Sequence, residues 1–517
     1  MTNNITILWA DDEIDLLKPH ILFLEQKGYN VITVKSGNEA IEKLTENVID
    51  VVFLDENMPG LSGLETISRI KTQFSFIPIV MITKSEEEQI MEDAIGSNIS
   101  YYLIKPVNPH QILHCLKMLT ENRKITTAKV SSDYQQTFRS ISMKLMDNMD
   151  YNQWIDMYKE LVFWDISLGE NDDTNIREIF YSQKAEANLV FSKFIAKNYT
   201  NWLSGSVSDK PLMSHTLLKE RVFSQIKDIP VYLVLIDNLR YDQWKAIEPT
   251  ISEYFRVESD EIYYSILPTA TQYARNSLFA GLMPNEIAKK YPQYWVDENE
   301  EGLKNEFEHR LLDEYLRRYG INIKHSYSKV LNMDFAKKVN DNLVNTMKTP
   351  FNVVIYNFVD MLSHAHTDVG VVRELADNEV AYRSLTSSWF EHSHLLEMFK
   401  YLSTKKVRIY ITTDHGSIRI KNPVKIIGDK ETNTNLRYKT GKNLNYASKD
   451  VFTVNNPLDI YLPKLNFSSQ YVFSCGDNFF VYPNNYNHFA NYYKDTFQHG
   501  GISMEEVLIP IISLVSK

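Results

Sequence analysis

This sequence has little cysteine, and it has neither a long apolar run nor the pattern of a signal peptide. The only two cysteines, Cys115 and Cys475, cannot build a disulfide framework or a cysteine-based zinc finger, and a reducing compartment is expected. No apolar stretch approaches the roughly 20 residues that a membrane-spanning helix needs. The N-terminus reaches the acidic residues 11–13 at once, which is not the pattern of a signal peptide. We therefore expect a cytoplasmic protein without a membrane span.

Excess basic charge is also missing. The formal net charge is -11, which argues against non-specific binding to long nucleic acid. No segment has the pattern of a helix-turn-helix with a basic recognition helix, so binding to duplex DNA is not expected either. A small phosphorylated substrate remains compatible with this charge, because a bound metal ion reverses the local sign. With 517 residues the chain exceeds one ordinary core, and we expect two or three domains.

The first part of the chain, to about residue 120, alternates apolar runs with amphipathic stretches. Helices such as Ile14–Lys27 and Ser62–Thr72 fit between the apolar runs. Five strands are predicted, at Ile5–Ala10, Val31–Val34, Val51–Leu54, Ile79–Ile82 and Tyr101–Leu103. Five such units predict a small doubly wound α/β domain.

Polar side chains follow the ends of these predicted strands. Asp11 and Asp12 follow the first strand, Asp55 the third, Thr83 the fourth and Lys105 the fifth. All five should meet at one edge of the sheet. Three carboxylates there would bind a hard divalent cation, most simply Mg²⁺. The cation and Lys105 can offset the charge of a phosphoryl group on Asp55, and Thr83 can hydrogen-bond to that group.

These strand ends lie in sequence motifs that resemble those of the receiver domain of two-component response regulators. The motifs are WADDE, LDENMPGLSG, MITKS and YYLIKP. The resemblance covers the whole first domain and implies a flavodoxin-like fold. It implies that Asp55 is the phosphorylated residue and that a sensor histidine kinase is the partner. Asp11, Asp12, Asp55 and the backbone of Asn57 would hold Mg²⁺.

The same resemblance assigns a conformational switch. It implies that Tyr102 is the switch aromatic, acting with Thr83 and Lys105, and that phosphorylation favours a homodimer. A degenerate site in a domain that serves only as a scaffold is the alternative. All five positions at the strand ends carry a chemically competent residue, which favours an active receiver.

The stretch from residue 125 to 205 has no strand-like run and is predicted to be a helical bundle. Apolar residues recur at helical spacing, as at Phe138, Ile141, Leu145 and Met149. A further helix is expected at about Asn175–Ala196, and the SGSVSDKP segment indicates a boundary. The apolar stripes are most simply core, although one of them could be a dimer surface exposed by phosphorylation. We therefore divide the chain into a receiver at residues 1–124, a connector at 125–205 and an effector at 206–517.

Three apolar runs in the effector each lead into an aspartate: VYLVLID, VVIYNFVDMLSH and VRIYITTDHG. Runs this apolar and β-branched predict strands buried on both faces of a parallel sheet, and ligands bind at the carboxyl edge of such sheets. These runs and the later QHGG segment supply six candidate metal ligands: Asp237, Asp360, His364, Asp414, His415 and His499. Three carboxylates and three histidines are enough to hold two metal ions.

The segment SILPTATQYARNSLFAGLMP supplies a candidate nucleophile. Its hydroxyl residues follow a proline and lead into a predicted helix, so a threonine hydroxyl and backbone N–H groups can meet at a helix N-terminus. A hydroxyl beside a divalent metal becomes a usable nucleophile, because the metal lowers its pKa. Both Thr269 and Thr271 are candidates for this role.

The order of the effector motifs is Asp, then PTxT, then Asp-xxx-His, then Asp-His-Gly, then His. This order resembles that of the alkaline phosphatase superfamily, and the motif sequences are most similar to those of the PglZ group. In PorX-type regulators of type IX secretion, a PglZ domain follows a receiver. The match covers roughly residues 215–517 and implies an alkaline-phosphatase-like α/β domain. It favours Thr271 over Thr269 as the nucleophile. It also implies two zinc sites, one formed by Asp360, His364 and His499 and the other by Asp237, Asp414 and His415.

Several other polar residues have two interpretations. Arg275 and Asn276, about one turn past Thr271, could contact phosphate oxygens or could cap and solvate the helix. Arg437 and Lys439 could line the substrate mouth, although a solvated loop is favoured. Four histidines are assigned to the core or the surface: His366, His392, His394 and His488.

Together these features predict a response regulator whose phosphorylation at Asp55 controls a dinuclear zinc phosphodiesterase. Carboxylate and imidazole ligands suit Zn²⁺, and Mn²⁺ is possible on chemistry alone. The resemblance implies a diester substrate, a nucleotide or an oligonucleotide, and a role in type IX secretion. The alternative is a metal-stabilised interaction module in which catalysis is dispensable. Such a module would signal by dimerising or by binding a sigma factor or a secretion-system component.

Overall fold

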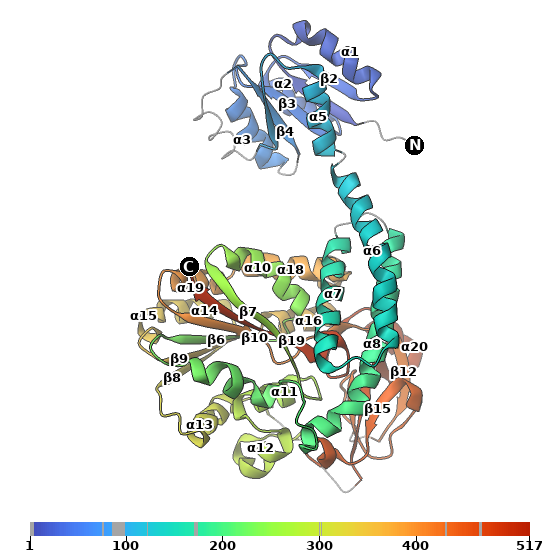
Figure 1. Ribbon diagram of the computed structural model, residues 1–517, viewed down its shortest axis with the longest axis vertical. Coiled ribbons are helices and arrows are strands. Elements are labelled where there is room, and N and C mark those ends of the chain that lie inside the picture. Colours follow the sequence, from blue (N-terminus) through green and yellow to red (C-terminus); the bar gives the residue numbers. More distant parts are fainter. Residues whose placement is uncertain are drawn as a thin grey trace. The chain divides into compact units, whose positions relative to one another are not determined.

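The computed structural model describes residues 5–74, 77–84, 99–120, 122–169, 174–298, 300, 302–429, 432–464 and 468–517 (Figure 1). By internal contacts the chain divides into two compact units, Met1–Tyr134 and Gln135–Lys517. From Gln135 onwards the residues of the predicted connector belong to the same compact unit as the effector. Among the described residues, no helix is both long enough and apolar enough to cross a membrane.

The first unit is a five-stranded parallel sheet with strand order β2-β1-β3-β4-β5. Successive residues of β1 enter two different cores: Ile7 and Trp9 belong to one cluster, and Leu8 and Ala10 to the other. Both faces are thus buried, which explains the continuous apolar runs. The elements are β1 (Thr6–Ala10), α1 (Lys18–Gln26), β2 (Asn30–Val34), α2 (Gly37–Glu46), β3 (Val51–Asp55), α3 (Gly63–Gln73), β4 (Ile79–Thr83), β5 (Tyr101–Ile104) and α5 (Pro109–Thr120).

The second unit is built on a six-stranded sheet with strand order β7-β19-β10-β6-β9-β8. Strands β10, β6, β9 and β8 run parallel, as the apolar runs predict, whereas β19 pairs antiparallel with both β10 and β7. The strands are β6 (Val231–Ile236), β7 (Phe255–Tyr264), β8 (His325–Val330), β9 (Phe351–Tyr356), β10 (Arg408–Thr412) and β19 (Leu508–Ser516). The three strands that lead into the candidate aspartates, β10, β6 and β9, are therefore neighbours in the sheet.

Helices cover both faces of this sheet, with α10 and α18 on one face and α11 and α13 on the other (Figure 1). The helices after the connector are α9 (Ser214–Leu217), α10 (Tyr241–Ser252), α11 (Thr271–Ala280), α12 (Pro284–Lys290), α13 (Glu308–Arg318), α14 (Met333–Asp341), α15 (Leu343–Thr346), α16 (Phe358–Asp368), α17 (Gly370–Leu375), α18 (Glu379–Glu391), α19 (His394–Ser403), α20 (Tyr486–Tyr493) and α21 (Met504–Val507). Two of them, α11 and α16, begin within the candidate site.

The connector consists of α6 (Asn122–Met146), α7 (Tyr151–Gly169) and α8 (Thr174–Ser204). The apolar side chains on one side of these helices form core, as predicted. The ring centroids of Trp154 and Phe191 lie 5.2 Å apart, and those of Phe191 and Tyr264, at the end of β7, lie 6.3 Å apart. Buried aromatic contacts of this kind join α7 and α8 to the main sheet.

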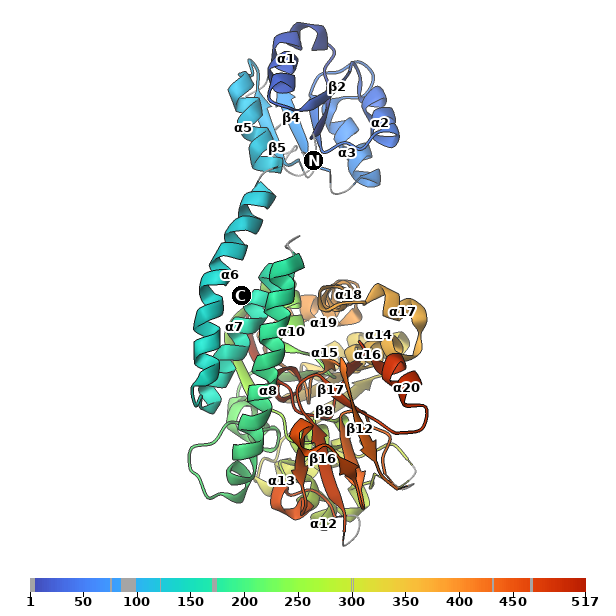
Figure 2. The same cartoon turned by 90° about the vertical axis from the view of Figure 1, so that its right-hand side faces the viewer.

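Residues 418–498 form three small sheets (Figure 2). Their strands are β11 (Ile418–Arg419), β12 (Asn422–Ile427), β13 (Tyr438–Gly441), β14 (Asn445–Tyr446), β15 (Val451–Val454), β16 (Gln470–Ser474), β17 (Asn478–Val481) and β18 (Phe497–Gln498). The pair β11–β18 connects the segment after β10 with the segment that carries His499.

Gly281 offers a test of how α11 is anchored. It ends α11 with φ +58°, and a Cβ atom there would overlap the ring of Tyr315. Gly281→Ala should lower the free energy of unfolding by about 2–5 kcal/mol, since left-handed strain and overpacking add.

Gly320 is the matched control, because it has φ +65° and no heavy atom within 4 Å of its added Cβ. Gly320→Ala should cost only the strain, about 1–2 kcal/mol. Urea unfolding monitored by circular dichroism measures both variants. Equal losses for the two would contradict the predicted contact with Tyr315.

Candidate metal centres

The first candidate site lies at the carboxyl edge of the N-terminal sheet. Ligand atoms of Asp11, Asp12 and Asp55 all lie within 4.8 Å of one another. The Lys105 Nζ lies 2.9 Å from Asp11 Oδ2 and 2.7 Å from Asp55 Oδ1. Burial raises the pKa of Asp55, and the charges of Asp11 and Asp12 add to this effect, while Lys105 opposes it. A divalent cation among the three carboxylates would relieve the remaining repulsion.

The other predicted receiver residues surround this cluster. Thr83 is buried at the end of β4, and its hydroxyl donates to Glu56, a partner that the sequence analysis did not single out. Asn57 is exposed just after β3, and Tyr102 is half-buried against the core of the same unit. These placements leave the roles of Asn57, Thr83 and Tyr102 as predictions.

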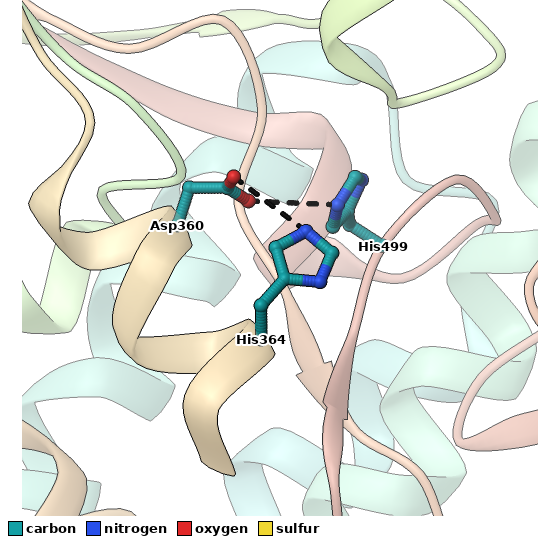
Figure 3. A group of neighbouring side chains, drawn as sticks. All are labelled: Asp360, His364 and His499. Carbon is teal, nitrogen blue, oxygen red and sulfur yellow. Dashed lines mark ion pairs between the residues drawn. The ribbon is translucent and has the colours of Figure 1, made fainter. Parts of the chain in front are cut away.

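The second candidate site combines Asp360, His364 and His499 (Figure 3). Asp360 and His364 lie one turn apart on α16, on the same face of that helix, and His499 follows β18. The Nε2 atoms of His364 and His499 lie 3.6 and 3.7 Å from the two carboxylate oxygens of Asp360. The three side chains thus converge on one point, as the ligands of a single ion must.

The third candidate site combines Asp237, Asp414 and His415. Asp237 follows β6 and Asp414 follows β10, so two adjacent parallel strands deliver the carboxylates. The His415 Nε2 lies 3.9 Å from Asp237 and 3.8 Å from Asp414. The rings of His415 and His499 stack with centroids 4.1 Å apart, so this site adjoins the one formed around Asp360.

Hydrogen bonds hold His415 and His499 in a form that can ligate a metal. The Nδ1 of His499 lies 3.1 Å from the Thr269 carbonyl oxygen, and the Nδ1 of His415 lies 3.2 Å from the Gly416 carbonyl oxygen. Donation from Nδ1 leaves Nε2 as the lone-pair nitrogen that faces the carboxylates. Burial and the neighbouring His415 and His364 hold the pKa of His499 well below its usual value, so its ring is neutral.

Two observations test whether these residues fit metal ions. Asp237 Oδ1 and Asp360 Oδ1 are buried and have no hydrogen-bond partner among the described residues. Such atoms are costly unless a ligand satisfies them. Three carboxylates also surround the guanidinium of Arg275, and the Lys329 ammonium lies 3.5 Å from one of them, Glu308. This cluster keeps an excess of one negative charge, which a bound divalent cation would offset. Carboxylate and imidazole donors suit Zn²⁺.

Arg275 differs from both of its predicted roles. It is fully buried, with Nε 3.0 Å from Asp414, Nη2 on Asp237 and Nη1 3.6 Å from Glu308. It therefore neither caps and solvates a helix nor offers a free guanidinium to a phosphate. Glu308, the first residue of α13, was not identified from the sequence, because no local pattern indicates that it pairs with Arg275. Asn276 is also buried, and its amide donates to the carbonyl oxygens of Gln272 and Lys304 at 2.8 and 3.0 Å.

The expectation of a solvated loop around Arg437 and Lys439 is wrong. Both side chains are buried, because the loop enters β13 and pairs with β16. The Arg437 guanidinium forms an ion pair with Glu506 at 2.7 Å. The Lys439 Nζ donates to the Asn433 carbonyl oxygen at 2.9 Å, and burial lowers the pKa of Lys439 to about 7. These partners do not place either side chain on a substrate.

The two candidate hydroxyls have different surroundings. Thr271 begins α11, is half-buried, and places its Oγ1 3.1 Å from the Nε2 of His415. Thr269 is fully buried; its hydroxyl donates to the Gly501 carbonyl oxygen at 2.9 Å and accepts from the Gly500 N–H at 3.0 Å. Thr269 therefore fixes the loop that carries His499, whereas Thr271 faces the candidate ligand His415.

The four histidines that were assigned to the core or the surface lie away from the candidate metal ligands. His366 is buried in the core, with Nε2 2.9 Å from the Ala376 carbonyl oxygen, and His394 pairs with Glu397. His392 and His488 are exposed. Within the described ranges, none of these four joins a cluster of three metal-ligating side chains.

Three family models match the chain. They are the response regulator receiver domain at residues 7–117, the PorX response regulator linker domain at residues 124–203, and the BREX system PglZ alkaline phosphatase-like domain at residues 217–514. These matches confirm the predicted receiver, helical linker and alkaline-phosphatase-like effector in that order.

Individual relatives match a smaller part of the chain. The transcriptional regulatory protein ResD of Bacillus subtilis is 30% identical over 126 residues, which are 24% of this chain and 52% of the relative. The alkaline phosphatase synthesis transcriptional regulatory protein PhoP of the same organism is 31% identical over 124 residues, 24% of this chain and 51% of the relative. The chain thus spans about half the length of these relatives. The solved structure of Vibrio cholerae chemotaxis protein CheY4 is 29% identical and covers 22% of this chain and 98% of its own, with a TM-score of 0.22.

Asp55 can be tested as the phosphorylated residue. Asp55→Ala should reduce labelling by radiolabelled acetyl phosphate in Mg²⁺ to background, because it removes the acceptor oxygen. Asp50→Asn is the matched control: Asp50 is exposed and directly precedes β3, at the end opposite to Asp55. The control should label like the wild type. Labelling of Asp55→Ala at the wild-type level would refute the assignment.

Proposed function

The chain belongs to the PglZ family of alkaline phosphatase-like domains, here linked to a response regulator receiver in the PorX-type arrangement, and on this basis we propose a dinuclear zinc phosphodiesterase controlled by phosphorylation at Asp55. The receiver implies a sensor kinase as partner, and the effector is a hydrolase-like domain of the phosphoric ester class. The observation that supports the proposal is the pair of adjoining three-ligand clusters with the Thr271 hydroxyl 3.1 Å from His415.

Thr271 is proposed as the nucleophile. Its hydroxyl stands at the first residue of α11, where unpaired N–H groups and the helix dipole favour an anion. Paired divalent cations would lower the pKa of that hydroxyl and offset charge on the attacking and leaving oxygens. The Thr271 hydroxyl would then lose its proton and its oxygen would attack phosphorus, while the bond to one ester oxygen breaks and that oxygen takes up a proton and leaves as an alcohol. Water would later cleave the bond between threonine and phosphorus and release a phosphate monoester.

The exposure of the ligands indicates how a substrate reaches the site. The His364 side chain is 65% exposed, whereas that of His415 is 0% exposed. A phosphate ester would therefore approach from the side of Asp360 and His364, with the cluster around Asp237 behind it. We propose a diester, a nucleotide or an oligonucleotide, on the basis of the family resemblance.

Phosphorylation of the receiver is the proposed input. A phosphoryl group adds about -1.5 to -2 charges at Asp55, enough to bias a two-state segment. We propose that it also favours a homodimer and that the output regulates type IX secretion. The alternative output is a metal-stabilised interaction surface for a sigma factor or a secretion component, with catalysis dispensable.

Thr271 variants separate these outputs. Thr271→Ala should keep both metal ions and lose hydrolysis of bis-p-nitrophenyl phosphate by on the order of 10³-fold or more, because it removes the nucleophilic oxygen. Thr271→Ser, which keeps a hydroxyl, should retain part of the activity. Metal content by mass spectrometry and initial rates are the measurements. A Thr271→Ala protein that cleaves at the wild-type rate would exclude this nucleophile, and one that keeps the cellular output would favour the interaction module.

A further inference from the structure

A network of buried charges lies outside the candidate metal centres. It includes three cations, Lys184, Arg240 and Arg383, and four anions, Asp165, Asp242, Glu379 and Glu505. The most exposed of their side chains, Glu379, is only 12% exposed. Burying so many charges is costly, and apolar residues of similar volume often serve stability equally well. What such a network offers is a fixed geometry.

The network begins in the connector. Lys184 on α8 binds Asp165 on α7 at 2.8 Å and Glu505 on α21 at 3.0 Å. Arg383 on α18 then binds the same Asp165 at 2.9 Å and Asp242 on α10 at 3.1 Å. Two helices of the connector are thereby joined to three helices of the effector without an intervening water-exposed group.

The network ends at Arg240. This residue precedes α10 and lies three positions after the candidate ligand Asp237. Its guanidinium binds Asp242 through two hydrogen bonds of 2.9 and 2.6 Å, and Glu379 at 2.6 Å. Arg240 is 0% exposed, so these contacts fix it without competition from water.

Arg240 also contacts the segment that carries His499, and it reaches the segment of Asp360 through Tyr382. Its guanidinium lies 5.4 Å from the ring centroids of both Tyr382 and Phe497, and these two rings stack at 3.8 Å. Phe497 precedes His499 by two residues, and the Tyr382 hydroxyl donates to the Val359 carbonyl oxygen, just before Asp360, at 3.5 Å.

The segment of Asp414 and His415 meets the same residue through Gly416. A Cβ atom on Gly416 would lie 3.2 Å from Arg240 Cγ and would overlap the carbonyl oxygen of Glu505. The backbone after His415 is therefore held directly between two members of the network. Arg240 thus adjoins three of the four segments that supply the six candidate ligands, and Tyr382 links it to the fourth.

Asp165 and Lys184, which begin the network in the connector, remain charged. Burial would raise the pKa of Asp165, but Lys184 and Arg383 outweigh it, and the pKa is lowered. Burial would lower the pKa of Lys184, but Asp165 and Glu505 hold it well above its usual value. The contacts therefore persist as ion pairs near neutral pH.

We propose that Arg240 is a positioning residue for the metal centres, and that the buried ion network lets the connector helices α7 and α8 set the geometry of the metal-ligand segments. This inference rests on the proposed dinuclear function. On this proposal the connector helices help to form the site instead of only linking two domains. A displacement of Lys184 or Asp165 would be transmitted through the ion pairs to the residues beside the candidate ligands.

The test uses Co²⁺ alone as the probe, because its visible absorption reports the arrangement of its ligands. Arg240→Lys keeps the charge but loses the paired hydrogen bonds to Asp242, and Lys184→Met removes the charge in the connector. The controls are matched. Arg408, the first residue of β10, donates to Glu258 through two nitrogens, and Arg408→Lys is the control for Arg240→Lys. Lys159 is another connector lysine, bound to Asp260, and Lys159→Met is the control for Lys184→Met.

Titrations of the full-length proteins, with the folded fraction measured by circular dichroism, give the affinity and the spectrum. At equal folded fraction, Arg240→Lys and Lys184→Met should weaken Co²⁺ binding about tenfold or more and shift the absorption bands. The controls should stay within about twofold of the wild type. If Arg240→Lys does not fold, Glu379→Gln replaces it, since it removes the other partner of the same guanidinium.

Unchanged affinity and spectrum in the folded variants would overturn the inference. A wild-type protein that binds no Co²⁺ would overturn both the inference and the proposed function. A wild-type protein that binds two ions but cleaves no ester would contradict only the proposed catalysis, and the spectra of the variants would still decide the role of the network.

Discussion

Asp237 and Asp414 stand side by side at the ends of two adjacent strands, and neither reaches water. Their repulsion must be neutralised inside the protein. Burial and the neighbouring carboxylates raise the pKa of Asp237 well above its usual value, whereas Arg275 and His415 lower that of Asp414 against the effect of burial. Arg275 and Lys329 together leave this pair and Glu308 with one excess negative charge, which a bound divalent cation would offset. The N-terminal sheet meets the same constraint with three carboxylates and one lysine at its carboxyl edge.

The elements that position the sites could be predicted because each depends on local sequence. An apolar run of five or six residues that ends in an aspartate indicates a buried strand with a polar end. The order of such runs then brings Asp237, Asp360 and Asp414 to one edge of a parallel sheet. The Asp-xxx-His spacing likewise puts His364 on the same helical face as Asp360.

What could not be predicted depends on partners that are far away in the chain. Neither Arg275 nor Arg437 could be assigned to the core from the sequence, because Glu308 and Glu506, which neutralise them, are separated from them by 33 and 69 positions. The antiparallel strand β19 has the same apolar pattern as a parallel one, since both are buried on two faces. The connector has ordinary helical periodicity, and nothing in that pattern shows that Lys184 and Asp165 are buried against the effector.

The central claim is that two metal ions lie at the carboxyl edge of the larger sheet. Anomalous diffraction from crystals grown with zinc, recorded above and below the zinc absorption edge, tests it most directly. The account predicts two peaks about 3.5–4 Å apart. One should lie among Asp360, His364 and His499, and the other among Asp237, Asp414 and His415. A single peak, or peaks remote from these six side chains, would contradict it.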